Sequence, residues 1–198
     1  MKEEVRKKAL EYKKELEEAA GSYQFQVLME EFKEKALQDE IAVWFLFKEI
    51  IKEAMEKPGI FDTNPSGIIG TFYILNDMDN EKSYSLFRWF IQNITEAVPS
   101  GVIELVTSLI TSFSLLEFRE FYGFAVSSNQ AQSAVGYLTL FNLLLEDRLN
   151  QEQATAIYEL SRTYENTRYH LGNAKDMIEE KYKELYAGED SSMDLELR

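Results

Sequence analysis

Apolar residues are concentrated in the middle of the chain. From Pro99 to Leu145 the only charged side chains are Glu104, Glu117, Arg119 and Glu120. Such a stretch must be covered by the rest of a chain that is otherwise rich in Glu and Lys. The helical spacing of its apolar residues predicts one helix over Ser100–Val126, with Pro99 at the entry, and a second helix from Ser127 or Ser128 to Leu145. The stretch therefore predicts a buried helical hairpin, and Ser127 with Gln130 fits a capping box at the start of its second helix.

Both ends of the chain carry narrow apolar seams on helices that are otherwise charged. A first helix is expected over Lys2–Ala20, and its seam continues through Gly21-Ser22, which either breaks or kinks the helix. A last helix is expected over Gln151–Ala187, with Asn150 as its N-cap and one apolar or aromatic residue in every seven. The main seam residues are Val5, Tyr12, Leu16, Ile157, Tyr164, Leu171, Ile178 and Leu185.

The region between the first helix and the hairpin predicts further helices. Tyr23–Lys57 contains the unbroken apolar run IAVWFLF and predicts a helix or helix pair that becomes buried as it proceeds. After a loop over Ile60–Ser66, we expect a short buried helix over Gly67–Leu75 and a longer one over Ser83–Val98.

Taken together, the pattern predicts an all-α fold, a single helical bundle of about six or seven helices. The buried hairpin lies at its centre, and long charged helices form its ends. Residues 1–187 are expected to form one domain, in which 1–22 and 151–187 are elongated flanking helices packed beside each other. Residues 188–198, GEDSSMDLELR, are expected to form a short acidic disordered tail.

Composition narrows the set of partners. The 198 residues include 35 acidic and 21 basic side chains, a net charge of −14. Phosphates repel such a chain, so neither a nucleic acid nor an anionic membrane surface is expected to bind it, whereas a basic partner remains open. Cysteine is absent, which excludes a thiol nucleophile, a disulfide or a Cys-ligated metal. The first residues lack the apolar core of a signal peptide, and polar residues interrupt the hairpin, so we expect a cytoplasmic protein without a membrane span.

Candidate chemistry is sparse. Glu104, Glu117, Arg119 and Glu120 interrupt the apolar stretch and either line a buried polar site or form the solvent-facing line of a half-covered helix, which the pattern favours. His170, the single histidine, is a further candidate for this polar site. No carboxylate stands three or four residues from it, which favours a structural role over a metal site.

A segment further upstream resembles a calcium-binding loop in the spacing of its acidic residues. Asp77, Asp79 and Glu81 alternate there, but Lys82 and Arg88 occupy positions where such a loop needs Gly and Glu. We therefore predict no catalytic, cofactor-binding or metal-binding residue, and we identify no family from the sequence.

Three functions remain open. The first is a non-catalytic protein-interaction or scaffold protein that acts through helix–helix contacts, with the two seams as its sticky surfaces and a homodimer as the expected assembly. The second is a carrier or sensor of an apolar small molecule or lipid, since 13% of the residues are aromatic and helical bundles hold such ligands between their helices. The third is an enzyme that uses the buried Glu and Arg residues.

Overall fold

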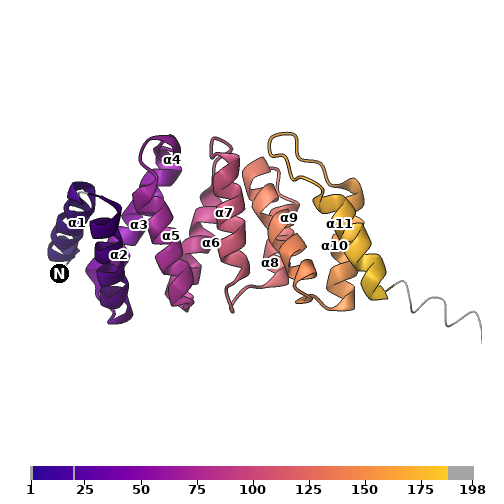
Figure 1. Ribbon diagram of the computed structural model, residues 1–198, viewed down its shortest axis with the longest axis horizontal. Coiled ribbons are helices and arrows are strands. Elements are labelled where there is room, and N and C mark those ends of the chain that lie inside the picture. The colour runs from indigo at the N-terminus through magenta and orange to yellow at the C-terminus, as the bar shows by residue number, and fades with distance from the viewer. Residues whose placement is uncertain (1, 20, 187–198) are drawn as a thin grey trace, which may run out of the picture. The chain divides into compact units, whose positions relative to one another are not determined.

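The computed structural model describes residues 2–19 and 21–186, and these are helical with no strand, which confirms the all-α class (Figure 1). The described residues form 11 helices, more than the six or seven that the pattern predicts. The predicted acidic tail, 188–198, lies outside the described residues. In chain order the helices are α1 (Lys2–Glu18), α2 (Ser22–Leu37), α3 (Ile41–Glu56), α4 (Ile60–Thr63), α5 (Ser66–Met78), α6 (Glu81–Asn93), α7 (Ser100–Thr111), α8 (Phe118–Ala125), α9 (Gln130–Leu145), α10 (Gln151–Thr163) and α11 (Ala174–Tyr186).

The helices gather into two compact units. Unit 1 runs to Val102 and includes Ser112–Leu115, whereas unit 2 contains Ile103–Thr111 and the chain from Leu116 onward. The single domain expected over residues 1–187 stays a prediction, because compactness does not test whether the units fold independently. None of the helices in the part described is both long and apolar enough to cross a membrane.

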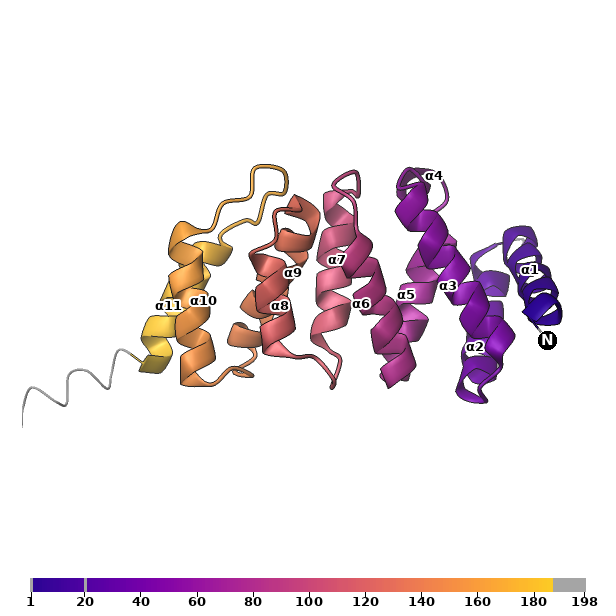
Figure 2. The same ribbon diagram turned by 180° about the vertical axis from the view of Figure 1, so that it is seen from behind.

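Helix α3 is the centre of unit 1 and packs against α1, α2, α5 and α6 (Figure 2). Its apolar run is only partly buried. Val43 and Phe47 are fully inaccessible to solvent, whereas Ile41 is 61% exposed and Trp44 and Phe45 are half-buried. The expectation that this helix becomes buried on all sides is therefore wrong, because only one face of the run packs into the core. Phe72 on α5 lies with its ring centroid 5.0 Å from that of Phe87 and 4.9 Å from that of Phe90 on α6. Burial of each ring contributes about 1.5–3 kcal/mol, so this cluster is a main source of stability for unit 1.

Helix α9 is the centre of unit 2 and packs against α8, α10 and α11 (Figure 1). It is apolar nearly all round, and Val135 and Leu140 are fully buried. Gly136 allows the backbone of α8 to approach closely, because a Cβ at this position would lie 2.3 Å from the backbone nitrogen of Ala125. The α8–α9 pair is therefore a tightly packed helical hairpin.

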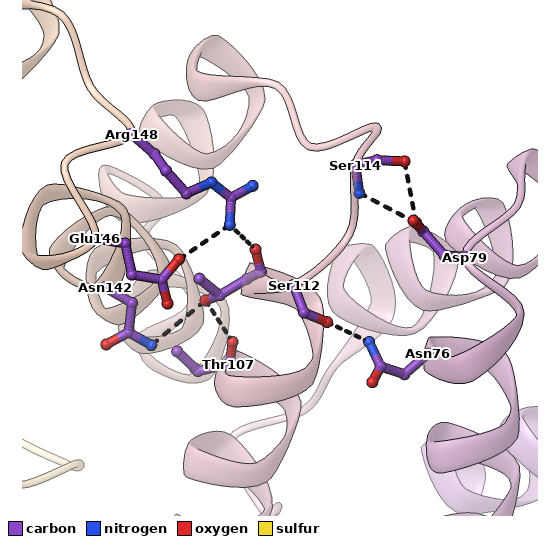
Figure 3. A network of polar contacts seen from close by, with 9 residues as sticks. Asn76, Asp79, Thr107, Ser112, Ser114, Asn142, Glu146 and Arg148 are labelled. Carbon is purple, nitrogen blue, oxygen red and sulfur yellow. Dashed lines mark hydrogen bonds and ion pairs between the residues drawn. The ribbon is translucent and has the colours of Figure 1, made fainter.

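The predicted helix over Ser100–Val126 is wrong, because α7 ends at Thr111 and α8 begins only at Phe118. The connecting segment is held by polar contacts (Figure 3). Within unit 1, the backbone N–H and the hydroxyl of Ser114 both donate to Asp79 Oδ1, at 3.1 and 3.2 Å. Within unit 2, Arg148 Nη1 donates to the carbonyl oxygen of Thr111 and so caps the end of α7.

The start of the hairpin's second helix also differs from the prediction. Asn129, not Ser127, caps α9, and its side chain accepts hydrogen bonds from the backbone N–H groups of Ala131 and Gln132 at 3.0 Å each. The hairpin of the structure is accordingly formed by α8 and α9, with α7 as a separate helix.

The last flanking helix is interrupted as well, since α10 ends at Thr163 and α11 begins at Ala174. In between, Asn166 Oδ1 accepts from the backbone N–H groups of Arg168 and Tyr169, at 3.2 and 2.9 Å. Gly172 adopts a φ of 60°, in the left-handed region that favours glycine. These local bonds replace helical ones, so the chain turns back and α11 packs on α10 and α9. The capping box of Asn150 with Gln153 at the start of α10 is confirmed.

Gly21 breaks the first helix rather than kinking it. Its φ of 130° is open to glycine and strained for other residues, and it separates α1 from α2. Ser22 is the first residue of α2 and does not cap it. Of the two alternatives expected over Tyr23–Lys57, a single helix or a helix pair, the structure has the pair, α2 and α3. Part of the loop expected over Ile60–Ser66 forms the one-turn helix α4.

Candidate functional site

The first seam is filled from within unit 1. Tyr12 and Leu16 are buried, and Val5 is half-buried. The ring of Tyr12 lies 5.0 Å from that of Phe32 on α2, and its hydroxyl donates to Glu40 Oε1 at 2.8 Å. Lys8 also pairs with Glu40, and this hydrogen bond together with that of Tyr12 lowers the pKa of the Glu40 carboxyl against the opposing effect of burial. This seam therefore serves the fold of the unit.

The second seam is filled from within unit 2. Ile157 and Ile178 are fully buried, whereas Leu171 and Leu185 are half-buried. Tyr164 stacks on Tyr137 of α9, with ring centroids 3.9 Å apart, and its hydroxyl hydrogen-bonds with that of Ser133 at 2.9 Å. Burial raises the pKa of both tyrosines, so both hydroxyls stay protonated.

These two findings change the argument for self-association. The sequence pattern predicts the seams as contact surfaces because charged residues predominate on the other faces of these helices, yet each seam finds its partners inside its own unit. The homodimer thus stays a prediction without an assigned surface.

The residues of the possible buried polar site do not form one. Glu104, Glu117, Arg119 and His170 are exposed, and Glu120 is half-buried. Their arrangement matches the solvent-facing alternative, and an enzyme would need a site elsewhere. The described residues hold no group of three or more His, Asp or Glu side chains that could bind a metal ion.

The acidic residues that echo a calcium loop have other partners. Asp77 pairs with Lys33 of α2, and Asp79 accepts the two hydrogen bonds from Ser114 (Figure 3). Asn76, beside them on α5, donates to the hydroxyl of Ser112. The motif thus ties the end of α5 to the Ser112–Leu115 segment of unit 1.

A groove in unit 1 is lined by residues of five helices, and we call it the α2–α5 groove. It has a volume of about 730 Å³ and is partly open to solvent. Its walls come from the C-terminal half of α1, the N-terminal halves of α2 and α5, the second half of α3, and α4. The main apolar side chains that line it are Phe25, Met29, Ile50, Ile60, Ile69 and Tyr73.

Glycines shape this groove. The break at Gly21 turns α2 away from the direction of α1, and both helix ends then line the same space. A Cβ on Gly70 would lie 3.1 Å from Phe25 and Met29, so glycine lets α2 pack closely against α5 at the floor. Gly67, by contrast, lines the groove with no heavy atom within 4 Å of where its Cβ would stand.

Polar residues occur at the rim of the groove. Lys13 Nζ donates to Glu53 Oε2 at 2.6 Å, and Lys57 approaches the other carboxylate oxygen at 3.5 Å. The hydrogen bond from Lys13 is the main cause that lowers the pKa of the Glu53 carboxyl, and burial opposes it. Glu17 and Glu30 lie at the rim with most of their side chains exposed.

A second, more open groove lies between α3 and α6 in unit 1, and we call it the tryptophan groove. Its volume is about 700 Å³, and its apolar residues are Ile41, Trp44, Phe45, Leu86 and Trp89. It contains both tryptophans of the chain. Lys82 lies 5.5 Å from the ring centroid of Trp44, and Lys48 lies 5.5 Å from that of Trp89.

Sequence reasoning missed both grooves. The residues of the α2–α5 groove appear in the sequence only as core positions of separate helices, and the apolar stretch GIIGTFYIL predicts a buried helix without indicating an open wall. The two glycines of this segment, Gly67 and Gly70, are visible in the sequence, but the exposure of Tyr73 is known only from the structure. No protein-family model matches the chain, and neither a curated protein nor a solved structure matches it.

Proposed function

We propose that this chain is a non-catalytic interaction protein whose α2–α5 groove binds an amphipathic helix of a protein partner. The observation that carries the proposal is a large, mainly apolar and partly open groove with walls from five helices. An amphipathic helix lays its apolar face into such a groove, which is a common mode of peptide recognition. The proposal keeps the helix–helix contacts expected from the sequence and moves them from the seams to the groove.

The shape of the groove favours a helix over a small molecule. Pockets for small ligands usually bury most of the ligand, whereas this groove is partly open to solvent. Tyr73 stands at its edge with 53% of its surface exposed, as suits an aromatic anchor at a protein interface. A long polar side chain at the edge would not offer the same apolar area.

An apolar small molecule or lipid is the second candidate. The volume of about 730 Å³ lies within the range of about 300–1,000 Å³ that is usual for ligand sites. Native mass spectrometry of the purified protein separates the two, because a bound apolar molecule adds a defined mass.

The test of the helix proposal fills the groove from within. Gly67→Phe introduces a ring where a Cβ has open space, at the second residue of α5. Binding is measured by calorimetry with a designed amphipathic helical peptide of about 18 residues, five turns, with a Leu/Ala face and Gln on the other face. We expect the variant to fold normally and to bind the peptide at least tenfold more weakly.

The chain offers a matched control for this variant. Pro65-Ser66-Gly67 at the start of α5 recurs as Pro99-Ser100-Gly101 at the start of α7, and Gly101 has equally open surroundings but does not line the groove. Gly101→Phe should leave peptide binding unchanged. Failure of the unmodified protein to bind the peptide, or equal binding by both variants, would refute the proposal.

A further inference from the structure

Two exposed carboxylates from two different helices line the α2–α5 groove. Glu17 belongs to α1 and Glu30 to α2, and their side chains are 61% and 66% exposed. The other charged residues that line the groove are Lys13 and Glu53. Three carboxylates and one ammonium group therefore face it.

Each of these two carboxylates has a lysine nearby, but that lysine makes a closer ion pair with a different carboxylate. Lys13 Nζ lies 4.0 Å from Glu17 but 2.6 Å from Glu53. Lys33 lies 3.5 Å from Glu30 and is in closer contact with Asp77. Glu17 and Glu30 thus retain most of their negative potential at the rim, since their neighbouring cations are already neutralised.

We infer that the partner of the groove is a basic amphipathic helix, with Lys or Arg residues that flank its apolar face. This inference rests on the proposed function of the groove and adds the charge of its partner. Lys or Arg beside the apolar face of the bound helix pairs with Glu17 of α1 and with Glu30 of α2. The net charge of −14 attracts such a helix at long range and raises its rate of association.

The experiment compares three peptides of about 18 residues, five helical turns, that share one Leu/Ala face and differ only in Gln, Lys or Glu on the other face. Affinity for the full chain is measured by calorimetry at about 50 mM and 200 mM salt. The Lys peptide should bind at least tenfold more tightly than the Glu peptide, with a smaller difference at the higher salt because exposed charges are screened.

A pair of double variants separates the rim from the overall charge. Glu17→Gln with Glu30→Gln removes the two rim carboxylates, and Glu11→Gln with Glu34→Gln removes two exposed carboxylates from the same helices outside the groove. Both change the net charge equally. The first pair should reduce the preference for the Lys peptide at least fivefold, and the second should leave it nearly unchanged.

The outcomes distinguish this inference from the function on which it rests. If the Gln peptide binds and Gly67→Phe blocks it, but the Lys and Glu peptides bind equally, the inference on charge is wrong and the groove remains a helix site. If no peptide binds, both are wrong. A change in tryptophan emission on binding would place the peptide in the tryptophan groove. A dimer or a co-purified apolar molecule in native mass spectra would assign the α2–α5 groove another occupant. Each of these results overturns the inference.

Discussion

At the scale of single residues, Gly136 and Gly123 differ in the space that a side chain would find at each position. A Cβ on Gly136 would lie 2.3 Å from the nitrogen of Ala125 and 2.8 Å from the carbonyl oxygen of Phe121, both backbone atoms of α8. Backbone atoms of a packed helix cannot move aside without moving the helix. Gly123 is exposed, with no heavy atom within 4 Å of its Cβ position.

We therefore predict opposite effects of the same substitution. Gly136→Ala should reduce the free energy of unfolding by about 3 kcal/mol or more, at the upper end for overpacked cores. Gly123→Ala should leave it unchanged or raise it by up to about 1 kcal/mol, because alanine is the better helix former. Urea unfolding followed by circular dichroism checks both, and equal effects would show that α8 and α9 do not meet at Gly136.

The ion pair of Lys13 with Glu53 should make the free energy of unfolding depend on pH. The pKa of the Glu53 carboxyl is lowered from its ordinary 4.5, so the folded state binds the proton more weakly than the unfolded state. Its stabilising contribution is complete above pH 4.5 and is lost as the pH falls through the lower folded pKa. Glu53→Gln should cost up to about 1 kcal/mol at neutral pH. The difference from the unmodified protein should vanish once the pH lies well below the lowered pKa of Glu53, where the carboxyl is protonated in both states.

The matched control is Glu18→Gln. Glu18 lies on α1 with 67% of its side chain exposed and pairs with Lys14 at 3.5 Å. This substitution should change the free energy of unfolding by less than about 0.5 kcal/mol at either pH. A pH-independent loss in Glu53→Gln would mean that the side chain stabilises by packing and not by charge.

At the scale of elements, the Ser112–Leu115 segment shows how a short connection becomes part of a core. Phe113 is fully buried, with its ring centroid 5.3 Å from that of Phe87 and 5.5 Å from that of Tyr84, both on α6. The segment joins α7 to α8, yet it belongs to unit 1. The side chain of Phe113 therefore contributes to the aromatic cluster, although the backbone of the segment is not helical.

Phe113→Ala should lower the free energy of unfolding by about 3–5 kcal/mol, the usual loss for a buried phenylalanine. Leu115→Ala in the same segment should cost less than about 0.5 kcal/mol, since Leu115 is 43% exposed. Chemical unfolding of the two variants side by side checks the prediction. A small effect of Phe113→Ala would show that the segment is not packed on α6.

At the scale of the whole molecule, charge and the division into two units decide the behaviour. The excess of acidic side chains, a net charge of −14, destabilises the folded state because these side chains repel one another. The ion pairs of the described residues are mostly exposed, and each contributes little to the stability of the fold. An increase in salt from about 10 mM to 0.1 M shortens the screening length from about 30 Å to about 10 Å.

We predict that this increase in salt stabilises the protein. A gain of about 1 kcal/mol corresponds to a rise in Tm of about 2–4 °C for a chain of this size. Differential scanning calorimetry in sodium chloride and in choline chloride measures it, and equal rises identify screening as the cause. A fall in Tm would show that the ion pairs outweigh the net repulsion.

The sequence by itself determined the helical class and most of the buried faces, because both follow from the spacing of apolar residues along a single helix. It also identified the cap at Asn150, whose bonds stay within a few residues. Only the tertiary structure decided where α7 and α10 end, because the groups that satisfy the freed backbone include distant residues: Asp79 and Arg148 at the first break and Gln130 at the second. The partners of the two seams were decided in the same way. The α2–α5 groove depends on the angles among five helices between Lys13 and Ile74, and those angles are set by packing, not by the pattern of any one helix.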